Sequence, residues 1–381
     1  MRRRCSRALA ASSFSSSSSG ERAARDRGCA PSGDRPGPAW AAPDSPSPRS
    51  ARRGVGRRPR GPRARREASA PPHPPFVELT TRRLQARAFC ATIPFVVHQD
   101  NVLRAITDDG AFRVIAADTT ATVRGAIEAQ RPETLDLVRT FADLLTGAVL
   151  VRESMAPDNR LQAILQGDNP RARMIADTHP DGATRGLIQL PQDVKELTYG
   201  TGGLLQVART LHNGSLHQGV VRVPADSKTL SAGFMAYMQE SEQTTTMIAI
   251  GAHLANGEVV SAGGYMVQLL PEVAEGPLAV MTERLKDFED IVPLLARGGA
   301  SPSELLRETL YGMPYTTVGD RSVHFGCRCS PDRLALSLAS LPRADIESLM
   351  VDGKTLEIEC DYCRTKYEFT QQQLRSLIDN N

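Results

Sequence analysis

Four of the seven cysteines of this 381-residue chain lie in the last 55 positions, and they constrain the fold more than any other feature. They form a Cys327-x-Cys329 pair and a Cys360-x-x-Cys363 pair, separated by thirty residues. Two intervening residues let the backbone turn so that both sulfurs face one point, which is typical of a zinc knuckle. Four thiolates also complete the closed tetrahedral set that a structural zinc ion prefers. The sequence therefore predicts one zinc ion per chain, held by these four cysteines.

A second interpretation of the cysteines is a pair of disulfides in an exported domain. Two disulfides in 55 residues are sparse for a disulfide scaffold, and the chain shows no usable signal peptide, so metal binding is favoured. His324 lies three residues before Cys327 and offers a further ligand. Because four cysteines already fill a tetrahedral site, we expect His324 to be a surface or packing residue.

The first 75 residues differ in composition from the rest of the chain. They hold 17 arginines, no lysine and 5 acidic residues, with a serine run over 15–19 and few large apolar side chains. Such a segment buries too little surface to offset its chain entropy, so we expect residues 1–99 to be a disordered Arg/Ser/Pro-rich extension. The composition also fits an organelle transit peptide or a misassigned start, and these two alternatives stay open.

The remainder of the chain carries 29 basic and 38 acidic side chains and is therefore acidic. Nucleic-acid binding needs a basic face that neutralises phosphates, so we expect no nucleic-acid partner. No window of about 18 apolar residues exists, so we expect no membrane span. We expect a cytoplasmic protein, with organelle targeting by the extension as the alternative.

Residues 100–271 are predicted to form an α+β domain in which an antiparallel β-sheet packs against helices. Hairpins are indicated at the Asp109-Gly110 and Asn256-Gly257 turns. Apolar residues recur every three or four positions from Leu135 to Val149, which predicts a helix with Pro132 in its first turn. The domain has no Gly-rich phosphate loop and no nucleophile elbow, so we expect no enzyme.

Residues 272–322 are predicted to be an amphipathic helical linker. Pro293 should end or kink its first helix, and Ser301-Pro302 is a good start for the next. We hypothesise that the apolar face of the linker is covered only conditionally. Six apolar residues at steps of three and four make up that face: Leu278, Met281, Leu285, Phe288, Val292 and Leu295.

Residues 323–381 are the predicted zinc domain. Helices are expected over 331–341, capped by Ser330, and over 345–350, followed by a strand with Leu356 and Ile358. The domain has few large apolar groups and lies below the size that usually folds without a cross-link. Zinc binding contributes on the order of 10–16 kcal/mol in small zinc peptides, so removal of the metal should unfold it.

From about Asp100 to its C-terminus the chain resembles the heat shock protein 33 family of redox-regulated molecular chaperones. The resemblance rests on Phe325-Gly-Cys-Arg-Cys-Ser330 with Cys360-Asp-Tyr-Cys363, and on the segments 181–186, 237–243 and 263–271. It implies a holdase that needs no nucleotide and is inactive while reduced and zinc-bound. When oxidised, such a protein forms two disulfides, here Cys327–Cys329 and Cys360–Cys363, releases zinc and unfolds its linker.

The resemblance further implies that the oxidised protein is a homodimer that binds unfolded client proteins, for which the linker face is the candidate surface. A disulfide within each pair closes only a short loop and stabilises little, so it cannot replace a metal that joins distant segments. Two alternatives stay open. One is a zinc-ribbon module that binds nucleic acid or protein. The other is a thiol–disulfide oxidoreductase using Cys360 and Cys363, although the βαβ context of that motif is missing.

Overall fold

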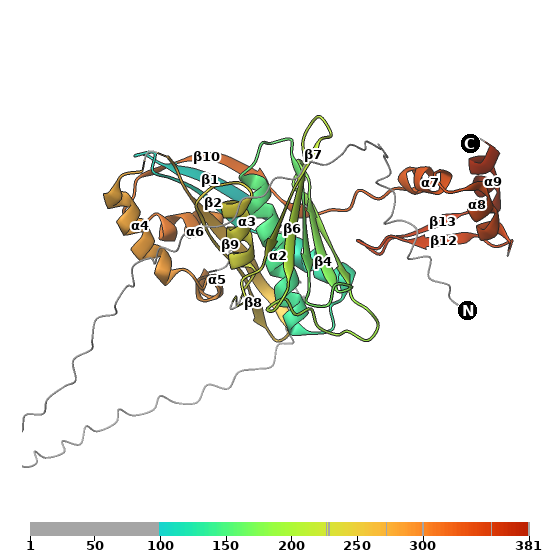
Figure 1. The fold of residues 1–381 in the computed structure, drawn as a ribbon, viewed down its shortest axis with the longest axis horizontal. Helices are drawn as coiled ribbons and strands as arrows, with labels where there is room; N and C mark the ends of the chain where they lie inside the picture. The colour runs from blue at the N-terminus through green and yellow to red at the C-terminus, as the bar shows by residue number, and fades with distance from the viewer. Residues whose placement is uncertain are drawn as a thin grey trace, which may run out of the picture. The chain divides into compact units, whose positions relative to one another are not determined.

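The structure is a computed structural model that describes residues 99–379 except 226, 228, 272, 299, 300 and 352. Almost all of the predicted extension, with Cys5, Cys29 and Cys90, therefore lies outside the described residues. The predicted α+β class is confirmed, because antiparallel sheets pack against helices and a small C-terminal domain follows (Figure 1). Among the described helices, none combines the length and hydrophobicity that a membrane crossing requires.

The first sheet has five antiparallel strands in the order β10-β1-β2-β9-β8. The two predicted hairpins join β1 to β2 and β8 to β9. At the second turn Asn256 and Gly257 both have positive φ, as a tight hairpin turn requires. The strands are β1 (Asn101–Thr107), β2 (Phe112–Asp118), β8 (Thr246–Ala255), β9 (Glu258–Leu269) and β10 (Tyr315–Ser322).

The second sheet has six strands in the order β11-β5-β4-β3-β6-β7. All neighbours are antiparallel except β11, which runs parallel to β5. The sequence did not predict β5 or β11. Strands β3 and β4 form an antiparallel hairpin across the segment Gly167-Asp168-Asn169-Pro170. The strands are β3 (Arg160–Gln166), β4 (Arg173–Thr178), β5 (Ala183–Gln189), β6 (Leu204–Thr210), β7 (Leu216–Arg222) and β11 (His324–Phe325).

Helix α2 (Leu135–Glu153) lies between the two sheets, and its residues share one buried cluster with both of them (Figure 1). Pro132 precedes this helix rather than lying in its first turn, because Thr134 caps it by accepting a hydrogen bond from the backbone of Leu137. Helices α1 (Thr120–Gln130) and α3 (Ser231–Glu240) complete the core.

Three linker helices cover the other face of the five-stranded sheet: α4 (Glu275–Asp287), α5 (Val292–Gly298) and α6 (Pro302–Thr309). The expectation for Pro293 was wrong, because Pro293 lies in the first turn of α5, where its missing N–H costs nothing. The first predicted helix is therefore two helices. The end of the predicted helical linker also differs, because residues 315–322 form β10, which pairs with β1.

The predicted linker face is only partly covered in this structure. Met281 and Leu295 are buried, with 2% and 1% of their surface exposed. Leu285 and Phe288 pack at the edge of the same cluster, and Val292 is half-buried. Leu278 is 38% exposed. The sheet residues beneath the linker helices alternate along the strands with residues that face α2, as the period of two in a strand requires.

The C-terminal domain contains α7 (Pro331–Ala339), α8 (Arg343–Met350), α9 (Gln371–Asp379) and a hairpin of β12 (Leu356–Glu359) with β13 (Lys366–Phe369). Ser330 caps α7 as predicted, by accepting a hydrogen bond from the backbone of Arg333. The sequence did not predict α9. The buried apolar side chains of this cluster are Leu338, Ile346, Phe369 and Leu374.

Candidate metal centre

The structure brings the four predicted cysteine ligands together. Their sulfur atoms all lie within 4.8 Å of one another, so the group could hold a metal ion. Sγ of Cys327 lies 3.8 Å from Sγ of Cys360, and Sγ of Cys329 lies 3.3 Å from Sγ of Cys363. Four sulfurs bound at about 2.3 Å around one zinc ion would stand about 3.8 Å apart. The donor set and its dimensions therefore fit a structural zinc ion.

Two loops from different parts of the chain supply the sulfurs. Cys327 and Cys329 follow directly after β11, whereas the Cys360–Cys363 turn joins β12 to β13. This turn is closed by two backbone hydrogen bonds, from Arg364 to the carbonyl of Cys360 and from Cys360 to that of Thr365. His324 is exposed on β11 and is absent from the ligand group, which agrees with its expected surface position.

A hydrogen bond between the sulfurs makes the Cys327 and Cys360 thiols unequal in acidity. A hydrogen bond from the Cys360 thiol lowers the pKa of Cys327 to about 4. Burial opposes this effect, and the guanidinium of Arg185, 3.2 Å away, reinforces it. The same sulfur–sulfur hydrogen bond, together with burial, raises the pKa of Cys360. The Tyr367 hydroxyl donates to Cys329 over 3.0 Å. Of the Cys327–Cys360 pair, the Cys327 sulfur is therefore the one that more readily becomes a thiolate.

The cysteine loops also contact the core directly. Strand β11 pairs with β5 through His324 and Phe325, and the backbone of Gly326 donates to the carbonyl of Thr184. Gln130, at the end of α1, donates to the carbonyls of Asp361 and Tyr362 at 2.7 and 2.9 Å. The candidate metal centre is therefore held at the β11 edge of the six-stranded sheet as well as by its own domain.

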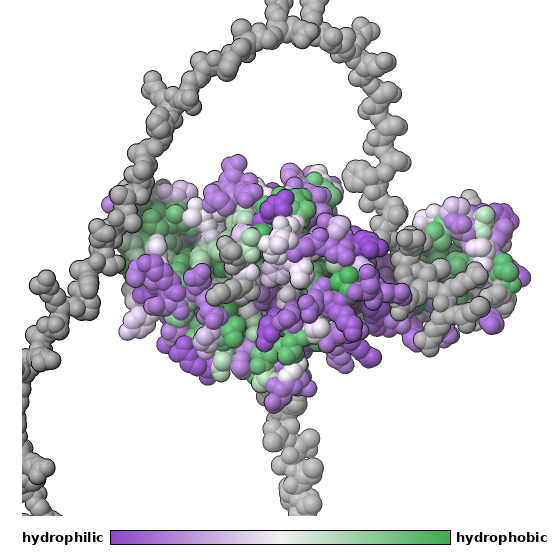
Figure 2. Space-filling model, turned by 60° about the horizontal axis from the view of Figure 1, so that its bottom comes forward, coloured by the Kyte–Doolittle hydropathy of each residue, from purple (hydrophilic) through white to green (hydrophobic). Residues whose placement is uncertain are grey.

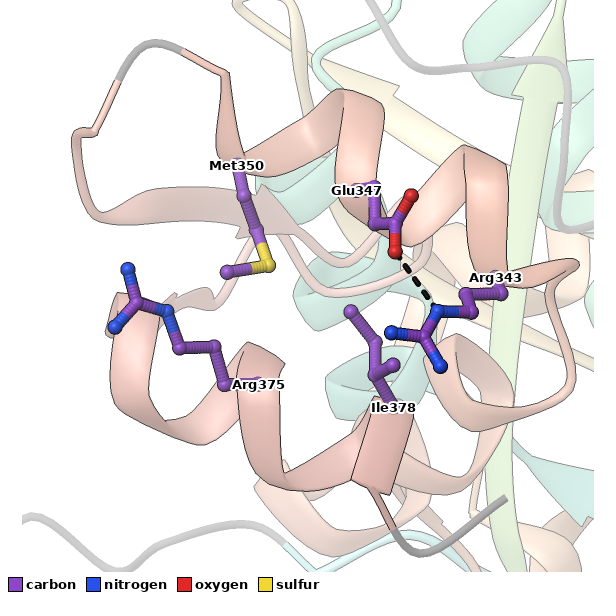
Figure 3. A pocket seen from close by; sticks show the side chains of 5 residues that line it. All are labelled: Arg343, Glu347, Met350, Arg375 and Ile378. Atoms are coloured by element: carbon purple, nitrogen blue, oxygen red, sulfur yellow. Dashed lines mark hydrogen bonds and ion pairs between the residues drawn. The ribbon is translucent and has the colours of Figure 1, made fainter.

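A small pocket of about 250 Å³ also lies in the C-terminal domain (Figure 3). Helices α8 and α9 form it, and an ion pair joins Arg343 to Glu347 at its rim. None of the four cysteines lines this pocket, so it is separate from the candidate metal centre. Its lining residues are Arg343, Glu347, Met350, Arg375 and Ile378.

Comparison with known proteins decides the family. The family model described as Hsp33 protein matches residues 100–370, which is more than half of the chain. The chain belongs to the Hsp33 family. This confirms the resemblance and places the chain in a chaperone family.

Curated Hsp33 relatives carry the name 33 kDa chaperonin. The relative from Desulfotalea psychrophila is 29% identical over 290 residues, which cover 74% of this chain and 97% of that protein. The relative from Streptococcus pyogenes serotype M4 is 31% identical over 293 residues, covering 74% and 99%. The crystal structure of the Hsp33 homologue from Thermotoga maritima aligns with a TM-score of 0.63 at 21% identity, over 74% of this chain and 99% of that one, and supports the fold.

Sequence reasoning missed the residues around the sulfurs. Arg185, Gln130 and Tyr367 contact the cysteine loops, and none of them was singled out. Arg185 does lie in the 181–186 segment that carries the Hsp33 resemblance, which is the one available signal for it. The pattern of the sequence contains nothing that connects residue 130 or 185 with position 327 or 362.

Proposed function

We propose that this protein is a redox-regulated holdase whose four cysteines form a removable cross-link. The observation that carries the proposal is the gathering of four sulfurs, from loops thirty residues apart, in a domain with few fully buried apolar side chains. Zinc, when bound there, would keep all four thiols in the thiolate form. Membership of a chaperone family supports the binding of unfolded client proteins as the output.

The oxidation step uses the two thiolate pairs, Cys327 with Cys329 and Cys360 with Cys363. In each pair two thiolates give two electrons to one peroxide molecule: an S–S bond forms, the O–O bond breaks, and two hydroxide ions leave. Two peroxide molecules therefore oxidise the whole site. Because a disulfide sulfur is a poor zinc ligand, the two loops lose their common cross-link.

We propose that loss of that cross-link leads the linker helices to unfold. In the reduced structure the helices bury one face of the five-stranded sheet, including Phe112, Val114 and Tyr265. On the face of the molecule in Figure 2, hydrophobic areas are interrupted by hydrophilic residues. If the linker unfolds, the sheet face and the linker residues become accessible together. A large continuous apolar surface is what an unfolded client can bind.

The test compares reduced and oxidised full-length protein in suppressing the aggregation of a thermally unfolding client. Peroxide with mild heat should release about one zinc ion per chain, raise the binding of a hydrophobic dye and suppress aggregation. We further propose that the oxidised form is a homodimer, which sedimentation of both forms will test. If zinc leaves while dye binding and aggregation stay unchanged, the proposal is wrong. Turnover in an insulin-reduction assay would favour the oxidoreductase alternative, and a salt-dependent gel shift would favour the nucleic-acid module.

A further inference from the structure

One arginine of the core reaches the metal centre. Arg185 on β5 places Nη1 3.2 Å from the sulfur of Cys327, and its guanidinium lies over the ring of Tyr362 at 4.1 Å from the ring centre. These two contacts join Arg185 to both cysteine loops, because Cys327 belongs to the first loop and Tyr362 to the second. The side chain is 17% exposed, so most of its surface is covered in this position.

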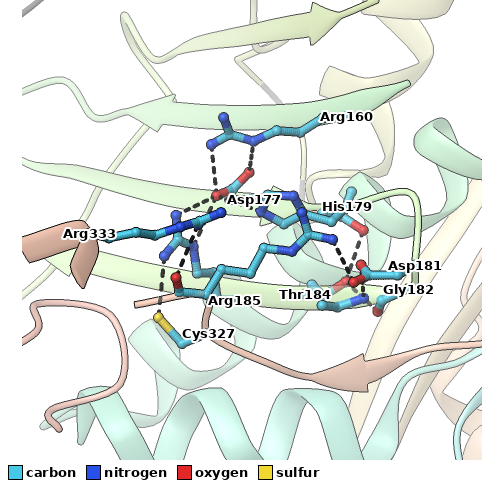
Figure 4. A network of polar contacts seen from close by, with 12 residues as sticks. Arg160, Asp177, His179, Asp181, Gly182, Thr184, Arg185, Cys327 and Arg333 are labelled. Atoms are coloured by element: carbon cyan, nitrogen blue, oxygen red, sulfur yellow. Dashed lines mark hydrogen bonds and ion pairs between the residues drawn. The ribbon is translucent and has the colours of Figure 1, made fainter. Parts of the chain in front are cut away.

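The core fixes the position of that arginine. Asp177 stands directly opposite Arg185 in the pairing of β4 with β5, and its carboxylate accepts from Arg185 at 3.0 and 2.9 Å (Figure 4). Asp177 is fully buried and is also held by Arg160, at 2.7 and 2.9 Å. A buried carboxylate with two arginine partners holds both guanidinium groups in a narrow range of orientations. Because Nε and Nη2 of Arg185 are held by Asp177, its third nitrogen, Nη1, is directed at the Cys327 sulfur.

We propose that Arg185 is a positioning residue that docks the metal centre on the core and through which the core senses the oxidation state of Cys327. This role rests on the proposed redox function, because Arg185 would connect the change at the sulfurs with the sheet. A thiolate is a charged acceptor for the guanidinium, whereas a disulfide sulfur is neutral and accepts weakly. Formation of the Cys327–Cys329 bond would thus remove the charged sulfur acceptor of Arg185 and weaken its contact with the first cysteine loop. The C-terminal domain would then detach from β5 as it loses its zinc.

The contact can be removed without unpairing a buried charge. In an Arg185→Gln variant, Asp177 keeps Arg160 as a bidentate partner, so the core is expected to fold. Arg185→Lys keeps the positive charge but not the planar fork that serves the carboxylate, sulfur and ring together. Arg173→Gln is the matched control, because Arg173 lies on the neighbouring strand β4 and bonds only to Gln189 on β5 among the described contacts.

The experiment uses the reduced, metal-loaded full chain and two readouts besides activity. Hydrogen exchange of segments 324–328 and 360–364 should increase about tenfold in Arg185→Gln, partly recover in Arg185→Lys and stay at the wild-type rate in Arg173→Gln. In the cobalt-substituted protein, loss of the hydrogen bond should move the thiolate-to-cobalt charge-transfer band to lower energy. The metal content of Arg185→Gln should stay at about one ion per chain.

Wild-type exchange rates and an unshifted cobalt band in Arg185→Gln would overturn the proposal. If that variant does not fold, Tyr362→Leu tests the same contact, because it removes the ring beneath Arg185 and leaves Asp177 unchanged. Hydrogen exchange of the same two segments should then increase. Oxidised wild-type protein should show the exchange pattern of reduced Arg185→Gln. The proposed function can fail separately: a wild-type protein that never holds clients refutes the chaperone switch, whereas the docking measurements on reduced protein still decide the role of Arg185.

Discussion

The core and the C-terminal domain are stabilised by different means. In the core, α2 and two sheets bury a continuous apolar cluster that includes Phe141, Leu145 and Phe234, all fully buried. The C-terminal cluster of the described residues is small, with four buried apolar side chains surrounded by half-buried ones. A core of the first kind responds to heat or denaturant, whereas we propose that the second kind depends on the four sulfur atoms. The difference predicts that the C-terminal domain can unfold while the core stays folded.

The strongest test of this comparison is removal of the metal. Treatment with a tight chelator under reducing conditions should unfold residues 327–379 and leave the core intact, since zinc supplies on the order of 10–16 kcal/mol in domains of this size. Limited proteolysis with mass spectrometry should then find new cleavage sites in the C-terminal domain and a protected fragment ending near Ser322. A chelated protein that still protects the backbone of Leu374 from hydrogen exchange would show that the small domain holds itself together.

The converse test lowers the stability of the core and leaves the four cysteines unchanged. Phe141 is fully buried, and its ring lies so close to Gly186 that an added Cβ there would be 2.4 Å from it. Phe141→Ala should lower the free energy of unfolding of the core by about 3–5 kcal/mol. Urea unfolding followed by circular dichroism measures this change, and Leu336→Ala, at a 72% exposed site, is the control with an effect within about 0.5 kcal/mol. Zinc content in the absence of urea should stay unchanged in both variants, and a loss in Phe141→Ala would contradict the separation.

The sequence predicted those parts of the fold whose cause is local. The spacing of apolar residues predicted α2, and Asn256-Gly257 predicted a hairpin. Both signals act over a few residues, because helix periodicity and turn chemistry are local. Strands β5, β10 and β11 were missed for the opposite reason. The residues of β10 are largely exposed and form a strand because they pair with β1, more than 200 positions earlier. Such a strand is created by its partner and leaves little pattern of its own.

The same distinction holds at the metal centre. Cysteine carries its ligand chemistry in its side chain, so four cysteines in two close pairs identified the sulfur group without a structure. Arginine and glutamine are ordinary surface residues in any sequence. Only the pairing of β4 with β5 shows that Arg185 is held by Asp177, and only the tertiary contact shows that it meets Cys327. In the same way, only the tertiary structure shows that Gln130 at the end of α1 bonds to the second cysteine loop.

A pH titration tests the description of the core, because the acidic side chain of Asp143 on α2 is buried in it. Burial raises the pKa of Asp143 from 3.8 to about 7, against a backbone hydrogen bond from Leu230 and the charge of Arg139. Below about pH 4 the carboxyl is protonated in both states and costs nothing. Between about pH 4 and pH 7 the unfolded chain loses its proton while the folded chain keeps it, so stability falls as pH rises.

Replacement by Asn removes this penalty. The stability advantage of Asp143→Asn over the wild type should grow by about 2–3 kcal/mol between pH 5 and pH 8, since each unit of pKa shift corresponds to about 1.4 kcal/mol. Urea unfolding at the two pH values measures it, and the difference between the two proteins cancels other titrations. An advantage that is the same at both pH values would mean that Asp143 is already ionised in the folded core.

The smallest expected effect on stability lies on the linker helices, which pack on one face of the core. Leu278 and Met281 are neighbours on one face of α4, but Leu278 is 38% exposed and Met281 only 2%. Leu278→Ala should therefore change the free energy of unfolding of the reduced protein by no more than about 0.5 kcal/mol, whereas Met281→Ala should cost roughly 2–5 kcal/mol and raise dye binding before any oxidation. If the linker face binds clients, Leu278→Ala should still raise the ratio of oxidised chaperone to client needed to suppress aggregation. Equal effects of Leu278→Ala on the reduced and oxidised forms would instead assign this residue to folding alone. A side chain that contributes little to the stability of the reduced form can be important for client binding only in the oxidised form, in which the linker is unfolded.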